Sequence, residues 1–284
     1  MSFQNIGVVG SGIMGSGVAE VAASTGTAVI VCSRTTERAD AVLVAIDESL
    51  ARQVEKGKRD AEEAAALRQR ITVTTELKDL AGCDFVMETV IEDLAVKLEL
   101  FATLGSVVAP TAVLATCTST LPVIDLAMQV ERPERVCGVH FFNPVTAMAL
   151  VEVVRPISAS DETIAAATAF VLACQKEPIE VKDRAGFIVN ALLFPYLNNA
   201  VRILEQGVAP KEGIDAAMKG GCGFPMGPFA LLDLVGLDTS LSILDALYAE
   251  YADANFAPVP LLRRMVSAGQ LGRKSGAGFY QYHQ

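Results

Sequence analysis

Short apolar segments rich in β-branched residues alternate with helical stretches through the first part of the chain. The segments that predict strands are 6–9, 28–33, 71–74, 84–90, 113–117, 135–142 and 150–154. Strands that alternate with helices are typical of a mostly parallel sheet with helices on its faces. The pattern therefore predicts an α/β fold for this part of the chain.

The region between the second and third predicted strands is longer than one crossover helix requires. Residues 35–70 contain two helical patterns separated by Lys56-Gly57-Lys58. A glycine break between two periodic segments is typical of a turn. We expect an inserted helical hairpin here.

After Asp183 the pattern becomes helical. The segments with helical periodicity, separated by Gly and Pro, are 186–207, 210–219, 237–252 and 259–268. We therefore expect two domains, 1–184 with the parallel sheet and 185–284 all helical. The boundary is expected within a few residues of 183–186.

The composition is that of a globular protein. The chain has 284 residues, of which 51% are hydrophobic and 20% charged, and its formal net charge is -10. An acidic protein repels the phosphate backbone, so we expect no nucleic-acid partner. No run reaches the roughly 18 apolar residues of a membrane span, and residues 1–10 lack the pattern of a signal peptide. We expect a soluble cytoplasmic protein without a membrane partner.

Cysteine and histidine usage argues against a metal site. The six cysteines form no CxxC pair and mostly lie in apolar segments, which predicts buried free thiols. The two histidines, His140 and His283, are too few for a structural zinc site of His and Cys. His283 is in the C-terminal tail, which leaves His140 as the candidate for imidazole chemistry near neutral pH.

The sequence GSGIMG follows the first predicted strand and opens the first helix. In a Rossmann-type turn Gly10 would make the tight bend, Gly12 would admit a pyrophosphate, and Gly15 would let the helix pack closely on the sheet. The helix N-terminus, which includes Ile13 and Met14, offers free N–H groups to a diphosphate. The strand, helix and second strand around the motif favour a dinucleotide site over an ordinary βα turn.

The end of the second predicted strand carries Ser33 and Arg34. An NAD-binding domain usually has Asp or Glu there, which binds the adenosine ribose hydroxyls. A hydroxyl followed by a guanidinium suits a 2′-phosphate instead, because Arg offers paired donors and no carboxylate repels the phosphate. We expect NADP(H) to be favoured. NAD(H) stays possible if Arg34 merely begins the next helix from solvent.

A histidine and a glutamate lie in two successive predicted strands. His140 is near the end of 135–142, and Glu152 is inside 150–154. A histidine on an apolar strand is usually a satisfied core residue, but a carboxylate there is costly to bury without a partner. If the strands are neighbours, each residue supplies the partner that the other needs. The carboxylate would then orient the imidazole and stabilise the imidazolium, which makes an acid–base pair.

With these motifs the chain resembles the L-3-hydroxyacyl-CoA dehydrogenase family, in particular the short bacterial 3-hydroxybutyryl-CoA dehydrogenase type. The likeness covers nearly the whole chain. The sequences that carry it are GSGIMG at 10–15, VIED at 90–93 with Lys97, Thr118-Ser119, HFFNP at 140–144, LVE at 150–152, GFIVN at 186–190, PMGP at 225–228, DLVGLD at 233–238 and LGRKSGAGFY at 271–280.

The resemblance implies an oxidoreductase that transfers a hydride between C3 of an acyl-CoA and a nicotinamide. His140 would act as general base on the 3-hydroxyl in oxidation and as general acid in reduction, with Glu152 orienting it. Ser119 and Asn190 would hydrogen-bond the reacting oxygen and the thioester region. The residues that the resemblance places near the cofactor are Glu92, Lys97, Ser119, Asn143 and Lys274.

The helical domain is rich in apolar residues, which favours a self-association face. The resemblance suggests a homodimer through this domain. The domain junction would close over the substrate, with the connection at 183–186 as hinge.

Three positions depart from the family pattern. Cys117 stands where the family usually has Asn, Ala191 where it usually has Arg, and Ser33 where an acidic ribose ligand is expected. The first two bear on the acyl substrate rather than on the reaction type.

Relatives hold CoA at the inserted hairpin. The basic residues of the hairpin in this chain lie mostly at one end and are Arg38, Arg52, Lys56, Lys58 and Arg59. An acyl group on a carrier protein would reach the same acid–base pair through the same phosphopantetheine arm.

Two other functions remain open. A β-hydroxyacid dehydrogenase of the 6-phosphogluconate dehydrogenase type would use a lysine at the start of the helical domain, and residues 186–200 contain none. A catalytically silent nucleotide-binding relative would keep the fold without the activity. The filled positions His140 and Glu152 favour an enzyme.

Overall fold

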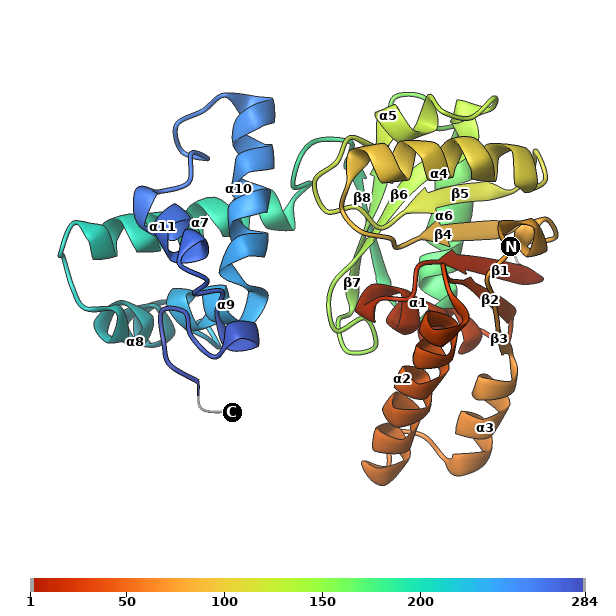
Figure 1. Ribbon diagram of the computed structural model, residues 1–284, viewed down its shortest axis with the longest axis horizontal. Helices are drawn as coiled ribbons and strands as arrows, with labels where there is room; N and C mark the ends of the chain where they lie inside the picture. Colours follow the sequence, from red (N-terminus) through yellow and green to blue (C-terminus); the bar gives the residue numbers. More distant parts are fainter. Residues whose placement is uncertain (1–2, 283–284) are drawn as a thin grey trace. The chain divides into compact units, whose positions relative to one another are not determined.

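The computed structural model describes residues 3–282, so His283 lies outside the described residues. The chain divides into two compact units, one ending at Asp183 and the other beginning at Arg184. Figure 1 shows a sheet with helices in the first unit and a helical second unit. Among residues 3–282, no helix has the length and apolar character needed to cross a membrane.

The first unit is built on one eight-stranded sheet in the order β3-β2-β1-β4-β5-β6-β7-β8. Its strands are β1 (Asn5–Val9), β2 (Ala28–Cys32), β3 (Ile71–Thr74), β4 (Phe85–Glu88), β5 (Val113–Thr116), β6 (Val136–Phe141), β7 (Leu150–Arg155) and β8 (Glu177–Lys182). All neighbouring strands run parallel except β6 and β7, which are antiparallel. The mostly parallel sheet predicted from the alternating pattern is confirmed.

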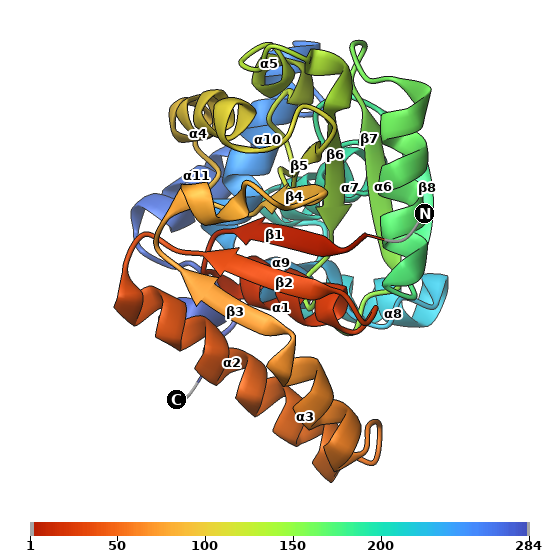
Figure 2. The ribbon, with the colours of Figure 1, turned by 90° about the vertical axis from the view of Figure 1, so that its right-hand side faces the viewer.

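Helices cover both faces of this sheet. They are α1 (Ile13–Ala23), α2 (Thr36–Glu55), α3 (Ala61–Gln69), α4 (Leu94–Val107), α5 (Val123–Ala127) and α6 (Asp161–Ala173), with short 3-10 turns η1 (Leu77–Leu80) and η2 (Pro133–Arg135). Figure 2 shows α4 and α5 on one face and α1 and α6 on the other. On the face that α1 and α6 cover, a core of apolar side chains from the strands, α1, α2 and α6 lies between the sheet and the helices.

The region between β2 and β3 forms the expected helical hairpin, α2 and α3. Thr35 is the N-cap of α2, and its side chain accepts a hydrogen bond from the N–H of Arg38. Asp60 is the N-cap of α3 and accepts in the same way from the N–H of Glu63. Both residues are favoured N-caps because their side-chain oxygens satisfy free N–H groups of the first turn. The break at residues 56–58 separates the two helices.

The second unit is a bundle of five helices within its described residues. They are α7 (Val189–Glu205), α8 (Lys211–Cys222), α9 (Pro228–Val235), α10 (Leu237–Tyr251) and α11 (Pro260–Ser267), followed by the 3-10 turn η3 (Arg273–Ser275). Leu197, Phe229 and Leu244 are among the fully buried side chains of its own core. The carboxylate of Asp215 in α8 accepts the N–H groups of Phe229 and Ala230, so it ties α8 to the first turn of α9.

Candidate active site

The turn between β1 and α1 has the shape that a dinucleotide requires. Gly10 has a φ of +125°, and a Cβ there would lie 2.5 Å from Oγ1 of Thr89. A Cβ on Gly15 would lie 2.1 Å from the carbonyl oxygen of Gly10, so the helix packs directly on the turn. A Cβ on Gly12 would meet nothing within 4 Å, so there is open space at the helix N-terminus.

Gly12 is the N-cap of α1 and provides no side-chain hydrogen bond. The N–H groups of Ile13, Met14 and Gly15 therefore point, with the positive end of the helix dipole, toward the space beside Gly12. This arrangement of backbone donors and open space fits a diphosphate. The residues present thus fit a dinucleotide cofactor at the place that the GSGIMG motif indicates.

Ser33 and Arg34 lie directly after β2, where the adenosine end of a dinucleotide would lie. Ser33 is 4% exposed, and within the described chain its buried hydroxyl has no hydrogen-bond partner. Buried hydroxyls normally have a partner, so the Ser33 hydroxyl has unused hydrogen-bonding capacity at the place where a cofactor would lie. Arg34 is exposed.

His140 and Glu152 face each other across two neighbouring strands. Strands β6 and β7 pair with His140 directly opposite Glu152, and Nδ1 of His140 lies 2.7 Å from Oε2 of Glu152. The two residues are 4% and 0% exposed. An ionised carboxylate can only accept, so the ring must donate its Nδ1–H to Glu152, which leaves Nε2 to exchange a proton elsewhere. The structure thus brings together the two residues that sequence spacing alone could not place in contact.

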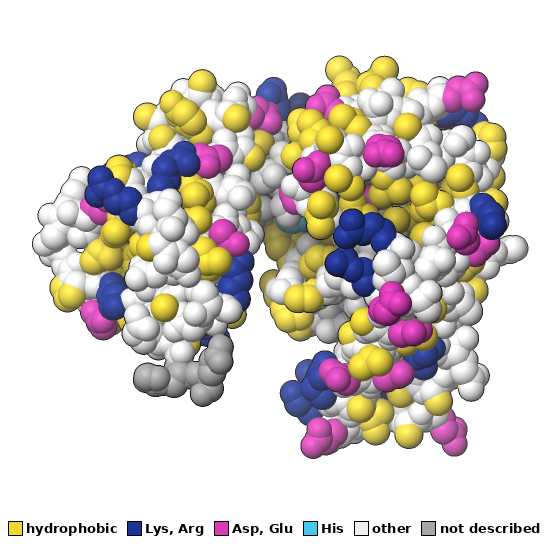
Figure 3. Space-filling model, viewed as in Figure 1, with side chains coloured by type: hydrophobic (Ala, Val, Ile, Leu, Met, Phe, Trp, Pro, Cys, Tyr) yellow, Lys and Arg dark blue, Asp and Glu magenta, His cyan; other side chains and the backbone are white. Residues whose placement is uncertain are grey.

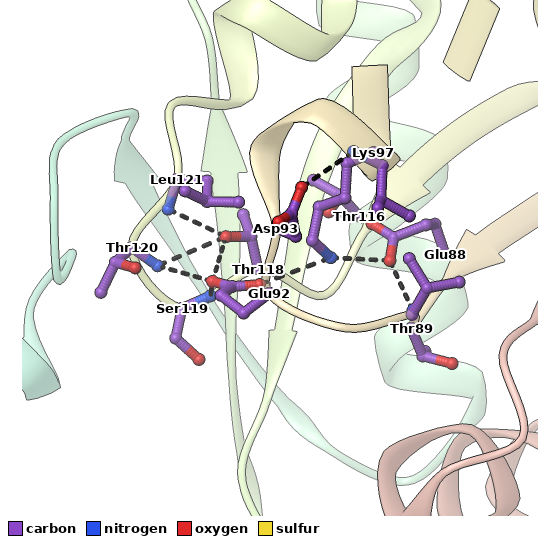
Figure 4. Close-up of polar contacts among 12 residues, drawn as sticks. Glu88, Thr89, Glu92, Asp93, Lys97, Thr116, Thr118, Ser119, Thr120 and Leu121 are labelled. Atoms are coloured by element: carbon purple, nitrogen blue, oxygen red, sulfur yellow. Dashed lines mark hydrogen bonds and ion pairs between the residues drawn. The ribbon is translucent and has the colours of Figure 1, made fainter. Parts of the chain in front are cut away.

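The hydroxyl of Ser119 lies next to the His140–Glu152 pair. Its Oγ lies 3.1 Å from Nε2 of His140. Ser119 belongs to a turn that follows β5, and the carboxylate of Glu92 holds that turn. Oε1 of Glu92 accepts hydrogen bonds from Thr118 Oγ1 at 2.6 Å, from Ser119 N at 2.8 Å and from Thr120 N at 3.3 Å (Figure 4).

Lys97 lies in α4 and is 1% exposed. Its Nζ donates to Oε1 of Glu88 at 2.6 Å and lies 3.4 Å from Oε2 of Glu92 (Figure 4). The structure therefore brings the two predicted cofactor residues Glu92 and Lys97 into contact with each other. The Glu92 side chain is 39% exposed, so its carboxylate remains accessible from outside.

Sequence reasoning did not single out Glu88. It is the last residue of β4 and is fully buried. A signal was present, because the strand Phe85–Glu88 is apolar up to this carboxylate, just as β7 is apolar around Glu152. A buried carboxylate requires a partner, and here the partner is Lys97.

Asn143 follows β6 and is exposed, just before the cis peptide bond to Pro144. Asn190 and Lys274 belong to the second unit. Asn190 is a buried residue of the first turn of α7.

Lys274 lies in η3 and donates to Asp238 at 2.7 Å. Burial alone would raise the pKa of the Asp238 carboxyl, but the hydrogen bond and charge of Lys274, helped by backbone N–H groups, lower it below its ordinary value.

Basic side chains are present on the surface of the first unit. Figure 3 shows a group of Lys and Arg side chains on the visible face of this unit, between the sheet and the α2–α3 hairpin. On the hairpin itself Arg52 lies 3.6 Å from Glu48 as an exposed i,i+4 pair, while Lys56 and Lys58 are exposed. No group of His, Cys, Asp and Glu in the described part of the chain is arranged to hold a metal ion.

Comparison with known families gives matches to both units. The model described as "3-hydroxyacyl-CoA dehydrogenase, NAD binding domain" matches residues 5–184. The model described as "3-hydroxyacyl-CoA dehydrogenase, C-terminal domain" matches residues 186–282. Together they cover nearly the whole chain, including both units of the structure.

Individual proteins match over the same length. The chain is 47% identical to a 3-hydroxybutyryl-CoA dehydrogenase of Mycobacterium tuberculosis, with 99% of each chain covered. It is 43% identical to a probable 3-hydroxybutyryl-CoA dehydrogenase of Bacillus subtilis, with 100% of this chain and 99% of the relative covered. Among solved structures, the (S)-3-hydroxybutyryl-CoA dehydrogenase PaaH1 of Ralstonia eutropha superposes with a TM-score of 0.97 at 38% identity, with 100% of both chains covered.

Proposed function

Because the chain belongs to the 3-hydroxyacyl-CoA dehydrogenase family, we propose that it interconverts L-3-hydroxyacyl-CoA and 3-ketoacyl-CoA, with His140 and Glu152 as its acid–base pair. The observation that carries this proposal is the 2.7 Å contact between Nδ1 of His140 and Oε2 of Glu152. The full-length relatives named 3-hydroxybutyryl-CoA dehydrogenases support a short acyl chain.

His140 moves the proton, and Glu152 supports it. In oxidation, Nε2 of His140 takes the proton of the substrate 3-hydroxyl as the C3–H bond breaks and the C3–O bond becomes a carbonyl. Glu152 keeps the ring in the tautomer whose Nε2 carries no hydrogen and stabilises the imidazolium that forms. In reduction the imidazolium returns the proton to the oxygen on C3. A nicotinamide, when bound, supplies or accepts the hydride.

Ser119 and Asn190 are proposed to hydrogen-bond the reacting oxygen and the thioester region. The position of Ser119 supports its part, because its hydroxyl already contacts Nε2 of His140. A substrate oxygen within reach of both groups would be held where the proton moves, which lowers the entropic cost of the step. Asn190, a buried amide at the start of α7, would add a donor from the second unit.

The proposed cofactor is NADP(H), with NAD(H) as the alternative. Gly10, Gly12 and Gly15, with the N–H groups of Ile13 and Met14, would hold the diphosphate. The unpartnered hydroxyl of Ser33 and the exposed guanidinium of Arg34 support a 2′-phosphate rather than ribose hydroxyls alone. The further residues proposed to lie near the cofactor are Glu92, Lys97, Ser119, Asn143 and Lys274.

We also propose the acyl carrier, the oligomeric state and the location of the protein. The acyl carrier is proposed to be CoA, and a carrier-protein thioester is the alternative because both present the same phosphopantetheine arm. The second unit is proposed to close over the substrate and to form a homodimer. The proposed location is the cytoplasm.

One experiment tests the proposed function and separates it from a silent nucleotide-binding relative. The wild-type protein is assayed with NADPH and NADH, each against acetoacetyl-CoA, longer 3-ketoacyl-CoA esters and a carrier-bound equivalent. We expect turnover of acetoacetyl-CoA with the higher kcat/KM for NADPH. Nucleotide binding without turnover of any acyl substrate would overturn the proposal.

The matched variant for the cofactor is Arg34→Ala. Loss of the guanidinium should raise KM for NADPH by about tenfold, the size of one charge-assisted contact to phosphate, and leave KM for NADH nearly unchanged. A large kcat/KM advantage for NADH in the wild-type protein would contradict the NADP(H) preference. An equal change for both nucleotides would place Arg34 outside the 2′-phosphate site.

A further inference from the structure

Glu88 is a buried carboxylate at the centre of the first unit. Its backbone lies between Val9 of β1 and Thr116 of β5 at the end of β4. Its Oε1 accepts from Lys97 Nζ and from Val90 N, both at 2.6 Å, and its Oε2 accepts from Thr116 Oγ1 at 2.6 Å. A fully buried charge needs partners of this kind, so Glu88 is held in one place from three sides.

Lys97 connects Glu88 to the surface of the site. Its ammonium is buried and contacts two carboxylates, Glu88 at 2.6 Å and Glu92 at 3.4 Å. The shorter distance and complete burial make Glu88 the principal counter-charge. Glu92 is thereby left to use its other oxygen, Oε1, on the turn that carries Ser119.

The contacts continue without a gap to the imidazole. Glu92 holds Ser119 by its backbone N–H, and the hydroxyl of Ser119 lies 3.1 Å from Nε2 of His140. Figure 4 shows Glu88, Lys97 and Glu92 in sequence, with the turn of Thr118 to Leu121 beyond them. Groups from β4, α4 and the turn after β5 are thus connected by hydrogen bonds and ion pairs.

We propose that Glu88 is a positioning residue for the acid–base pair, acting through Lys97 and Glu92 on the Ser119 turn. Without the Glu88 charge, the buried ammonium would draw the carboxylate of Glu92 toward itself, because a buried cation requires a full counter-charge. The turn would lose its acceptor, and the Ser119 hydroxyl would no longer be fixed against His140. This inference rests on the proposed function.

The test is a double-mutant cycle on kcat for acetoacetyl-CoA, with Glu88→Gln, Ser119→Ala and the double variant. If Glu88 acts through Ser119, Glu88→Gln lowers kcat by about tenfold in the wild-type background and by less than about twofold in the Ser119→Ala background. Equal fold-changes in both backgrounds would overturn the inference and assign Glu88 a purely structural role.

A second readout does not depend on turnover. The chain has two histidines, so its histidine ring NMR spectrum is simple, and His140→Ala assigns the His140 signal. Glu88→Gln should shift the Nε2 and Hε1 resonances of His140 in the protein without substrate. An unchanged His140 signal in a folded Glu88→Gln protein would contradict the inference.

The control for buried charge is Glu20→Gln. Glu20 is a buried carboxylate of α1 that accepts from the side chain of Gln53 in α2. Its replacement should lower Tm but leave kcat and the His140 resonances nearly unchanged. If the wild-type protein does not reduce acetoacetyl-CoA, the proposed function fails, whereas turnover with an additive cycle defeats only the role of Glu88.

Discussion

A carboxylate inside an apolar strand requires a partner, because burial of an unpaired charge is costly. At residue scale this rule predicted the central acid–base pair of the candidate site. It led from the sequence of β7 to the pair of Glu152 and His140, which the antiparallel register places opposite each other. The same rule applies to Glu88, but its partner Lys97 lies on a helix whose position the sequence pattern did not specify. A partner on a neighbouring strand can be inferred from topology, while one on a helix requires the packing itself.

Replacing Glu152 with Gln tests the orienting role of this residue. The amide keeps the shape but cannot stabilise imidazolium, so kcat should fall by about a hundredfold or more while nucleotide affinity changes little. Steady-state kinetics, nucleotide titration and thermal unfolding of Glu152→Gln give the answer. If the variant keeps near wild-type kcat and only Tm falls, Glu152 is a structural partner of His140.

At the scale of elements, alternation of apolar segments predicted seven of the strands and the helical hairpin of the first unit. It did not predict β8 or α9. Strand β8 is an edge strand with a proline and several exposed positions, so its pattern is not that of a buried strand. Helix α9 (Pro228–Val235) is apolar at every position except Asp233, so it shows no alternation of polar and apolar faces.

Two glycines of the turn between β1 and α1 should respond differently to the same substitution. Gly15→Ala places a methyl group 2.1 Å from the carbonyl oxygen of Gly10, so it should destabilise the fold by about 1–3 kcal/mol and weaken nucleotide binding. Gly12→Ala meets nothing within 4 Å and should leave Tm nearly unchanged, yet it should raise the nucleotide Kd by at least about tenfold by occupying the diphosphate space.

Chemical denaturation and nucleotide titration of both variants check this contrast. Wild-type protein and the variant Gly82→Ala serve as references, because a Cβ on Gly82 meets nothing within 4 Å and its backbone is not left-handed. Wild-type affinity in Gly12→Ala would place the diphosphate elsewhere.

At the scale of the whole molecule, the exposure of the six cysteine thiols provides a test of the packing. Of the six thiols, Cys222 is exposed, Cys117 is intermediate and the other four are buried. The expectation of buried thiols therefore fails for Cys222, which lies at the end of the exposed last turn of α8. Burial raises the pKa of Cys137 and Cys174 to about 12. It raises the pKa of Cys117, only partly exposed, to about 12 as well.

A thiol titration follows from these values. A thiol with a pKa near 12 is thiolate in about one part in ten thousand at pH 8, and the thiolate is the reactive form. We expect a disulfide reagent at pH 8 to modify one thiol rapidly in the native protein and all six only after unfolding. Cys222→Ser should abolish the rapid phase. Any rapidly modified thiol in that variant would show that the packing differs from this structure.

The most direct test of the whole account is the kcat of His140→Ala for reduction of acetoacetyl-CoA, measured beside its Kd for the nucleotide. Loss of the group that moves the proton at the C3 oxygen should lower kcat by about a hundredfold to ten-thousandfold and leave the Kd within about threefold of wild type. A kcat equal to that of the wild-type enzyme would show that His140 does not carry the proton, and the proposed mechanism would be wrong.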